Sequence, residues 1–319
     1  MDLLSIVREK GKSFVGTDSF PGIEAVIHHI EVAEKHFNMG PSSEFLYTDV
    51  IYRANQAFEG ALKEAFRVLA RKNPVGKSPS EIEKYLESEK LLKDRVLAQF
   101  RNYRTEWRNK STHDYQLFFS SQEALLAIVS ISAFFSILLD QMLQKHSHDL
   151  EQQKLQRRSY SLIHEVPNYN DLDFLNQSVE LLKHFSADLR DDVNSRTTAL
   201  TDYEILGRLS GFITQSDPEI EVVLDKLIKT RNQRLRPDVI LTKRDKSIVV
   251  ELTRFSSERM RRVREGIMKL RSYLDALGLT EGVVFIPALG NETLEVQEKE
   301  FEVNGKLIRA VLVVPRSKS

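Results

Sequence analysis

The chain has 319 residues and a formal net charge of zero, from 46 basic and 46 acidic residues. At about 150 residues per domain this length predicts two domains, and a hydrophobic content of 41% with 29% charged residues excludes a largely disordered chain. The absence of Cys excludes disulfide frameworks, Cys-ligated zinc, iron–sulfur clusters and a Cys nucleophile, and the balanced charge excludes a protein that binds nucleic acid by being basic throughout.

The first part of the chain is predicted to be helical. Apolar residues recur at the spacing of one helical face over residues 49–72. Pro79 and Ser80 are expected to open the next helix, and Ser80 with Glu83 fits a capping box. The apolar residues expected to form the core stripe after this start are Ile82, Leu86, Val96, Leu97 and Phe100.

The most apolar stretch covers residues 124–139. Ser120 and Glu123 fit a capping box at its start, and the helix is expected to end near Leu143. A bilayer span needs about 20 residues, so this shorter stretch is predicted to be a buried core helix. The first residues show no signal-peptide pattern, and we therefore expect a soluble, cytoplasmic protein without a membrane partner.

Residues 150–215 are polar and mostly helical in pattern, with one amphipathic helix expected over 172–189. Asp217 followed by Pro218 is typical of a helix start, with Asp as the N-cap and Pro in the first helical position. We expect this helix to run to Thr230.

The last part of the chain changes character. β-branched residues predict two strands over 238–242 and 247–253, and 282–286 is predicted to be a buried strand. Between them, residues 256–277 form a predicted long helix that ends at Gly278. Its expected core stripe is Met260, Val263, Ile267, Leu270, Leu274 and Leu277.

A hairpin around an Asn-Gly pair is the final predicted element, over residues 301–314. The order of elements predicts a multidomain protein. Residues 1–145 are expected to form an all-α helical bundle, residues 146–203 a helical connector, and residues 204–319 an α/β domain with a mixed sheet.

The segment from Arg108 to Tyr115 combines residue types that suit phosphate chemistry. Arg108 is a permanent cation that can grip a phosphate, and His113 titrates near neutral pH and can transfer protons. On one straight helix these two side chains would point about 140° apart. They could converge at a helix end or across a dimer interface, and a solvated helix terminus is the alternative interpretation.

This segment resembles the motif of the HEPN family of small helical ribonucleases. That motif has Arg, a polar residue, a few further residues and His, followed by a strongly apolar helix, and the match covers roughly residues 20–145. Tyr115 completes the version found in HEPN toxins that pair with nucleotidyltransferase antitoxins. Such an antitoxin or nucleotidyltransferase is therefore an expected partner.

The resemblance implies metal-independent RNA cleavage, in which the 2′-hydroxyl attacks the adjacent phosphate. His113 would transfer protons, Arg108 would hold the phosphate, and Asn109 would orient one of them. Lys110 would bind the nucleic acid, and Tyr115 would support the site or be a modification target. A homodimer is also implied, because two copies of the motif form one composite site in this family. Glu59 is a candidate accessory acid or a solvated helix residue.

A second constellation lies in the predicted strand pair. Asp238 at a strand start and Glu251 late in the neighbouring strand could share one metal ion, and such hard oxygen ligands suit Mg²⁺. A carboxylate inside a run as apolar as Ile-Val-Val-Glu-Leu is costly to bury unless it is paired or bound to metal. The alternative is a strand end at which the Glu meets an Arg.

The arrangement resembles the PD-(D/E)xK nuclease fold of restriction endonucleases, over roughly residues 204–315. The resemblance implies that Asp238 and Glu251 bind metal, with Glu221 as the extra acid that many members carry on the preceding helix. Thr253 stands where the family has its catalytic lysine, and Lys269 on the next helix could substitute for that lysine. Otherwise the domain has lost cleavage and retained binding, of DNA or of RNA.

Charge is unevenly placed around this second constellation. Residues 231–271 contain thirteen Lys and Arg against five Asp and Glu. Arg259 and Arg262 belong to a cluster at one helix start and are predicted to bind the nucleic-acid backbone. Solvated helix faces carry such clusters too.

Three hypotheses follow. The first is a HEPN endoribonuclease acting as an antiviral or toxin-like effector, with a C-terminal domain that binds or cleaves nucleic acid. The second is a Mg²⁺-dependent DNA nuclease through the C-terminal domain, with the helical domain as dimeriser. The third is a degenerate, nucleic-acid-binding scaffold.

Overall fold

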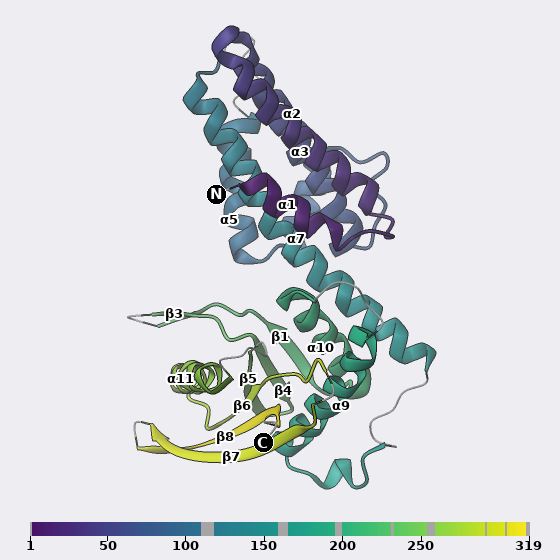
Figure 1. Cartoon of the computed structure of the whole chain (residues 1–319), viewed down its shortest axis with the longest axis vertical. Helices are drawn as coiled ribbons and strands as arrows, with labels where there is room; N and C mark the ends of the chain where they lie inside the picture. Colours follow the sequence, from purple (N-terminus) through teal and green to yellow (C-terminus); the bar gives the residue numbers. More distant parts are fainter. Residues whose placement is uncertain are drawn as a thin grey trace. The chain divides into compact units, whose positions relative to one another are not determined.

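The computed structural model describes residues 2–109, 118–158, 165–194, 200–230, 233–253, 259–290, 292–303 and 305–316 (Figure 1). A helical region is followed by an α/β region with a six-stranded mixed sheet, which confirms the predicted fold class. The chain divides into two compact units, Met1–His146 and Ser147–Ser319, so that most of the segment predicted as a connector belongs to the second unit.

The first unit is built from helices with short connections. Its described elements are α1 (Leu3–Lys12), α2 (Phe20–Met39), η1 (Gly40–Ser42), α3 (Phe45–Leu69), α4 (Pro79–Ser88), α5 (Asp94–Tyr103), the π-helical turn η2 (Arg104–Arg108) and the first part of α7 (Ser121–Arg157).

Helix α4 starts two residues earlier than its predicted capping box. Ser78 is the N-cap, with its hydroxyl accepting from the N–H of Glu81, and the Glu81 side chain reaches back to Ser78. Both this pair and the Ser80–Glu83 pair have the required spacing. Pro79 decides between them, because its fixed φ favours the first helical position. Glu83 instead lies buried beside Arg104, at 3.6 Å.

Aromatic side chains from three helices form the centre of this unit. Phe58 on α3 stacks on Tyr103 with ring centroids 4.7 Å apart and contacts Phe134 of α7 at 5.3 Å. The buried Tyr103 hydroxyl donates to Asn55 Oδ1 at 3.1 Å, so its burial leaves no unsatisfied donor. Helix α3 therefore serves as the central helix of the bundle.

Helix α7 begins with the predicted capping box. The Ser120 hydroxyl accepts from the Glu123 N–H, and the Glu123 carboxylate accepts from the Ser120 N–H at 2.9 Å. The helix runs past the predicted end near Leu143 to Arg157. It is long and apolar enough to cross a membrane by length and composition alone, but 61% of its most apolar window is buried in the protein. The predicted burial of this helix is confirmed.

The second unit combines helices with a sheet. Its further described elements are η3 (Tyr169–Asp171), α9 (Phe174–Asn194), α10 (Asp202–Ser216), β1 (Glu221–Leu224), β2 (Ile228–Lys229), β3 (Arg234–Leu235), β4 (Val239–Lys243), β5 (Lys246–Leu252), α11 (Arg259–Leu277), β6 (Glu281–Phe285), β7 (Leu294–Val303) and β8 (Lys306–Pro315).

The main sheet has the order β1-β4-β5-β6-β8-β7. Strands β5, β6 and β8 run parallel to one another, and the remaining neighbours are antiparallel. Helices α9 and α10 cover one face of this sheet, and α11 covers the other as the crossover from β5 to β6 (Figure 1). The predicted strands over 238–242, 247–253 and 282–286 are confirmed as β4, β5 and β6.

The predicted helix from Asp217 to Thr230 is wrong. Asp217 ends α10 instead of starting a helix, with its N–H bonded to Ile213 O at 2.9 Å, and the chain continues into β1. A residue before proline avoids the helical region, so an Asp-Pro pair also suits a helix end. The Asp217 carboxylate accepts from Lys243 Nζ at 2.7 Å and from the Tyr169 hydroxyl at 3.1 Å.

Helix α11 ends at Gly278 as predicted, and this residue has a φ of +68°. Val263, Leu270 and Leu274 of the predicted stripe are buried, but Met260 is 67% exposed and does not belong to the core. The predicted hairpin is confirmed and is longer than expected. Strand β7 forms an outer edge of the sheet, with exposed residues along most of its length.

Candidate functional site

Asp238, directly before β4, lies opposite Glu251 on the neighbouring central strand β5. Ile240 of β4 pairs with Val249 of β5, and both face α11. Because strand side chains alternate, Asp238 shares the face of Ile240, and Glu251 shares the face of Val249. Asp238 and Glu251 each lie one residue beyond the Val239–Val250 pair, so they are directly opposite each other. The two carboxylates therefore meet beneath α11.

Lys269 joins this pair from α11. Its Nζ lies 2.7 Å from Glu251 Oε1, and 59% of its side chain is exposed, whereas 1% of the Glu251 side chain is. Gly266, one turn earlier on the helix, allows the close approach, since a Cβ there would lie 2.9 Å from Val284 Cγ1. A solvent-accessible cation thus covers a buried acid.

The electrostatics reflect this burial. Burial raises the pKa of Asp238, and the neighbouring Glu251 charge raises it further, to about 7, although the Leu252 N–H donates to Asp238 Oδ2 at 2.9 Å. Burial also raises the pKa of Glu251, against the effect of Lys269. Burial acts to lower the pKa of Lys269, but Glu251 and Asp238 raise it overall. We name Asp238, Glu251 and Lys269 the carboxylate–lysine cluster.

The donor set of this cluster fits a divalent cation. Glu251 Oε2 is buried and accepts no hydrogen bond from any described N–H group, and a hydrogen bond between the Glu251 and Asp238 carboxyls requires that one of them is protonated. Asp238 and Glu251 repel each other when both are ionised, and a shared cation would relieve that repulsion and satisfy the orphaned oxygen. These two residues are the ones that would hold Mg²⁺.

Glu221 is not brought to this cluster. It lies on β1, not on a helix, and pairs with Thr242. Thr242 is four residues beyond Asp238, which corresponds to about 13 Å along a strand. The residue nearest the cluster in register is Asp225, directly after β1, whose N–H donates to Asp238 O at 3.1 Å. The predicted extra acid is therefore displaced from the cluster.

Thr253 lies directly after β5, where its N–H donates to Phe285 O at 2.9 Å. Its Oγ1 would be 3.4 Å from a Cβ on Gly266, so Thr253 fills the space between the sheet and α11. Thr253 carries no positive charge, and the cation that lies beside Glu251 is Lys269 of α11. Tyr273, which the sequence did not suggest, lies near this cluster, and burial followed by the charges of Glu251 and Asp238 raises its pKa.

The N-terminal constellation is described only in part. Arg108 Nη1 donates to Asn109 Oδ1 at 3.2 Å, and Arg108 Nε lies 4.0 Å from Glu59 Oε1. Both Arg108 and the buried Trp107 belong to the π-helical turn η2. The other three predicted residues, Lys110, His113 and Tyr115, lie outside the described residues.

The predicted backbone-binding residues lie at the start of α11. Arg262 is exposed and pairs with Glu265 at 3.5 Å. Arg264 is exposed and makes no ion pair with any described residue. The Arg259 side chain lies outside the described part of the chain.

A second acidic group, which was not predicted, is formed by Glu151, Asp188 and Asp192 on α7 and α9. Three cations of the described residues already contact it, and one of them is Arg158, whose Nη1 lies 3.0 Å from Asp188 Oδ1. Lys154 Nζ lies 2.8 Å from Asp192 Oδ2 and 3.5 Å from Glu151 Oε1, and Arg208 of α10 contacts Glu151 at 3.4 Å. The group is an ion-pair network that joins three helices. Its sequence signal is the Glu151–Lys154 pair at i,i+3 spacing.

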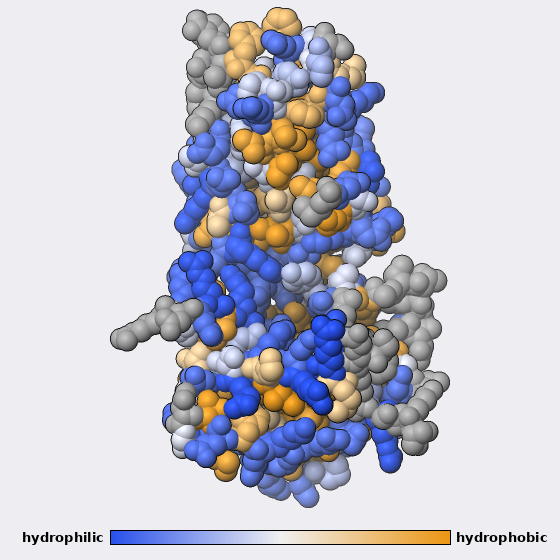
Figure 2. Space-filling view, turned by 60° about the vertical axis from the view of Figure 1, so that its left-hand side comes forward, coloured by the Kyte–Doolittle hydropathy of each residue, from blue (hydrophilic) through white to orange (hydrophobic). Residues whose placement is uncertain are grey.

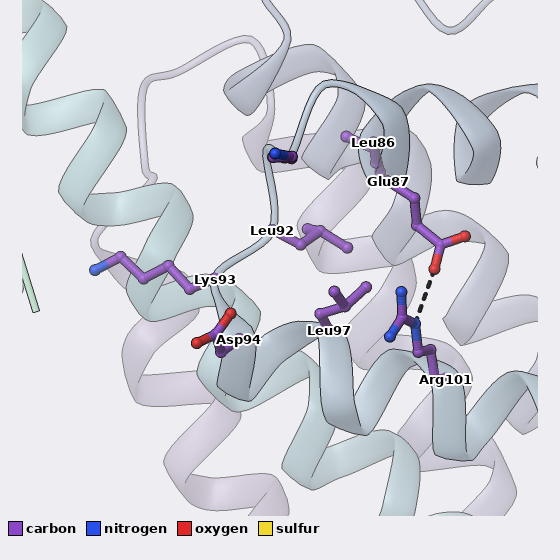
Figure 3. A pocket seen from close by; sticks show the side chains of 8 residues that line it. Leu86, Glu87, Leu92, Lys93, Asp94, Leu97 and Arg101 are labelled. Carbon is purple, nitrogen blue, oxygen red and sulfur yellow. Dashed lines mark hydrogen bonds and ion pairs between the residues drawn. The ribbon is translucent and has the colours of Figure 1, made fainter. Parts of the chain in front are cut away.

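A surface pocket of about 510 Å³ lies between α4 and α5 in the first unit (Figure 3). Leu86, Leu92 and Leu97 line it, and Glu87 pairs with Arg101 at 3.0 Å along its rim. None of the residues singled out from the sequence as catalytic lines this pocket.

No known protein family, curated protein or solved structure matches this chain.

Proposed function

We propose that the α/β region is a divalent-metal-dependent nuclease that hydrolyses phosphodiester bonds at the carboxylate–lysine cluster. One observation carries the proposal: Lys269 Nζ lies 2.7 Å from Glu251, beside Asp238. The buried Glu251, the half-buried Asp238 and one accessible cation provide both a metal-binding pair and a group for an anionic substrate. The resemblance to PD-(D/E)xK nucleases supports the same assignment, with Lys269 in place of the lysine that Thr253 replaces.

The residues would divide the chemistry among them. Mg²⁺ bound at this cluster would supply a Lewis acid and lower the pKa of a water molecule. Asp238 and Glu251 would hold the ion, and the Leu252 N–H fixes the orientation of the Asp238 carboxylate. Lys269 would donate hydrogen bonds to a phosphate oxygen or to the attacking water, and its charge would stabilise the negative charge that develops during attack.

The test is purified full-length chain incubated with DNA and with RNA, with Mg²⁺ or with EDTA. We expect cleavage that requires Mg²⁺ and is lost in Glu251→Gln and Asp238→Asn. Glu221→Gln is the matched control, since it removes a carboxylate from the same sheet at the end of β1 away from the cluster. Full activity in EDTA or in Glu251→Gln would contradict the proposal.

A second candidate function is metal-independent RNA cleavage at the HEPN-like motif, in a toxin-like or antiviral setting. The observation that favours it is the π-helical turn at Arg104–Arg108, because such turns occur often at functional sites. Arg108 ends this turn and lies near Glu59. In this reading Arg108 would hold a phosphate and His113 would transfer protons.

The homodimer that this second function requires has a candidate surface. Hydrophobic side chains gather on one face of the helical unit (Figure 2). On α7, Leu125, Leu126 and Val129 are 47%, 54% and 41% exposed, and the exposed rings of Phe45 and Phe118 lie 5.9 Å apart. An apolar surface of this kind is typical of an interaction site.

Activity in EDTA distinguishes the two candidate functions. Metal-independent cleavage should survive EDTA and disappear in Arg108→Ala and in His113→Ala. Arg101→Ala, which removes an exposed Arg from α5, is the matched control. If the chain binds nucleic acid but cleaves none under either condition, both proposals fail and the scaffold hypothesis remains.

A further inference from the structure

Strands β2 and β3 form a small two-stranded ribbon outside the main sheet. The ribbon connects β1 to β4, and its two pairs are Ile228 with Leu235 and Lys229 with Arg234. Leu235 packs against the hydrophobic cluster under α11 that also contains Val263. One face of the ribbon is thus attached to the α/β unit, and the other faces solvent.

The solvent face carries an unfavourable charge pair. Lys229 and Arg234 are both exposed and stand directly opposite each other, and neither makes an ion pair with any described residue. Like charges at directly opposed strand positions destabilise a sheet. The exposed Lys226 adds a third cation, and residues 226–236 contain no Asp or Glu. A bound anion would turn this repulsion into attraction.

The ribbon lies next to the carboxylate–lysine cluster. Its base is fixed by the Asp225 N–H, which donates to Asp238 O, and by Arg236, which lies 3.6 Å from Asp225 Oδ1. Arg234 is four residues before Asp238, which corresponds to at most about 13 Å of extended chain. Phosphates follow one another by about 3.4 Å along the axis of a duplex strand, so this separation corresponds to at most about four nucleotides between the cluster and a phosphate at Arg234.

The composition of the ribbon favours a duplex backbone over single-stranded bases. Residues 226–236 contain no Phe, Tyr or Trp, whereas sites for single strands stack bases on aromatic side chains. A duplex presents its phosphates outward, and a DNA groove about 12 Å wide admits a two-stranded ribbon. The deep and narrow major groove of duplex RNA does not admit side chains in this way.

We infer that the β2–β3 ribbon is a phosphate-binding arm that holds the backbone of a DNA duplex beside the carboxylate–lysine cluster. The position of the cut relative to the arm rests on the nuclease proposed above. The arm itself binds and does not take part in the chemistry. Its cations Lys229 and Arg234 determine affinity and its dependence on salt.

The first test is binding, measured in EDTA by fluorescence anisotropy with a labelled DNA duplex and the full chain. The double variant Lys229→Ala/Arg234→Ala should raise Kd about tenfold and make the slope of log K against log salt shallower by about two, because each lost phosphate contact contributes about one. Lys299→Ala/Lys306→Ala is the matched control, because it removes two exposed cations from the β7–β8 hairpin.

Further probes distinguish the occupant. A single strand of the same sequence, a duplex RNA and vesicles of anionic lipid should each show a smaller difference between the arm variant and the wild type. A larger difference with any of them, or equal Kd values for duplex DNA in the arm and control variants, would overturn the inference. The arm variant should melt no lower than the wild type, since it removes a repulsive pair.

A separate measurement tests the role of the arm independently of the proposed nuclease activity. Hydrolysis of a small phosphodiester such as bis(p-nitrophenyl) phosphate reports on the cluster without the arm. The arm variant should retain that hydrolysis and lose duplex affinity, and an equal loss of both would overturn its role as a binding arm. If the wild type hydrolyses nothing, the nuclease proposal fails, and the binding measurement still decides on the arm.

Discussion

Lys269 and Glu251 form an ion pair in which the cation is exposed and the carboxylate is buried, with 2.7 Å between Nζ and Oε1. An approaching anion would meet the ammonium first, because the Glu251 side chain is only 1% exposed. A metal ion, by contrast, must compete with that ammonium for Glu251. Lys269 should therefore favour the binding of an anionic substrate and oppose the binding of a metal ion.

Replacing Lys269 should separate catalysis from metal binding. We expect Lys269→Met to lower kcat by at least about 100-fold, since one charge-stabilising group is removed, and Lys269→Arg to retain part of the activity. Calorimetry should show Mg²⁺ binding that is unchanged or tighter in Lys269→Met, because the competing cation is gone. Loss of Mg²⁺ binding in this variant would show that Lys269 only supports the fold. Lys299→Met, an exposed Lys on β7, is the control.

Gly266 should be intolerant of a side chain. A Cβ there would lie 2.9 Å from Val284 Cγ1, a β-branched residue fixed in the sheet, so α11 would have to move outward. We expect Gly266→Ala to lower the free energy of unfolding by about 1–3 kcal/mol and to reduce cleavage, because Lys269 moves with the helix. Urea denaturation measures the first effect. Ser272→Ala on the exposed side of α11 should change stability by less than about 0.5 kcal/mol.

The contact between Lys243 and Asp217 should stabilise the attachment of α10 to the sheet. Both side chains are largely buried, at 14% and 5% exposure, so Lys243→Met leaves a buried carboxylate without its cation, with the Tyr169 hydroxyl and the Glu219 N–H as its donors. We expect a loss of about 3 kcal/mol in the free energy of unfolding. Arg244→Met is the neighbouring control. That side chain is 80% exposed, and its pair with Glu219 should contribute less than about 1 kcal/mol.

Stability should depend on pH through Glu151. Burial, followed by its interaction with Asp188, raises the pKa of Glu151 from 4.5 to about 7. Because the folded pKa is raised, the stability contributed by the protonated carboxyl is fully present below pH 4.5 and is lost as pH rises through about 7. The shift corresponds to about 3 kcal/mol for this group alone, at about 1.4 kcal/mol per pKa unit.

Glu151→Gln isolates this effect, because Gln has the shape of the protonated acid without its charge. Chemical denaturation should give equal stabilities for variant and wild type near pH 4.5, and a more stable variant near pH 8. A difference that stays constant across this range would contradict the prediction. Glu180→Gln, which removes a partly exposed i,i+3 pair with Lys183, is the control.

The strands that carry the carboxylates could be predicted because their signals are local. Runs of β-branched residues marked β4 and β5, whereas the register between the two strands puts Asp238 and Glu251 on one face. Lys269 could be named as a replacement for the residue at Thr253. Its contact with Glu251 could not be predicted, because it depends on the approach of α11 to the sheet over Gly266.

The wrong and missed predictions concern residues whose positions depend on contacts that are distant in sequence. Asp217-Pro218 is compatible with the start or the end of a helix, and the β1–β4 pairing, which is not local, decides between them. Glu221 was misplaced as a consequence. The Glu151 network was missed because its members come from three helices and are near in sequence only within a helix, as Glu151 is to Lys154 and Asp188 is to Asp192. Met260 has core spacing but lies in the first turn of α11, beyond the sheet-covered part.

The strand order places basic residues at one edge of the sheet and acidic residues at the other, an asymmetry that the zero net charge does not reveal. The basic arm follows β1 at one edge, and Glu295, Glu298, Glu300 and Glu302 lie along β7 at the other, about 24 Å away across five strand spacings. A polyanion would be attracted toward the first edge and repelled from the second, and so would be turned into one orientation before contact. The acidic side chains of β7 would also repel a second copy of that strand, which protects an otherwise open edge from sheet extension.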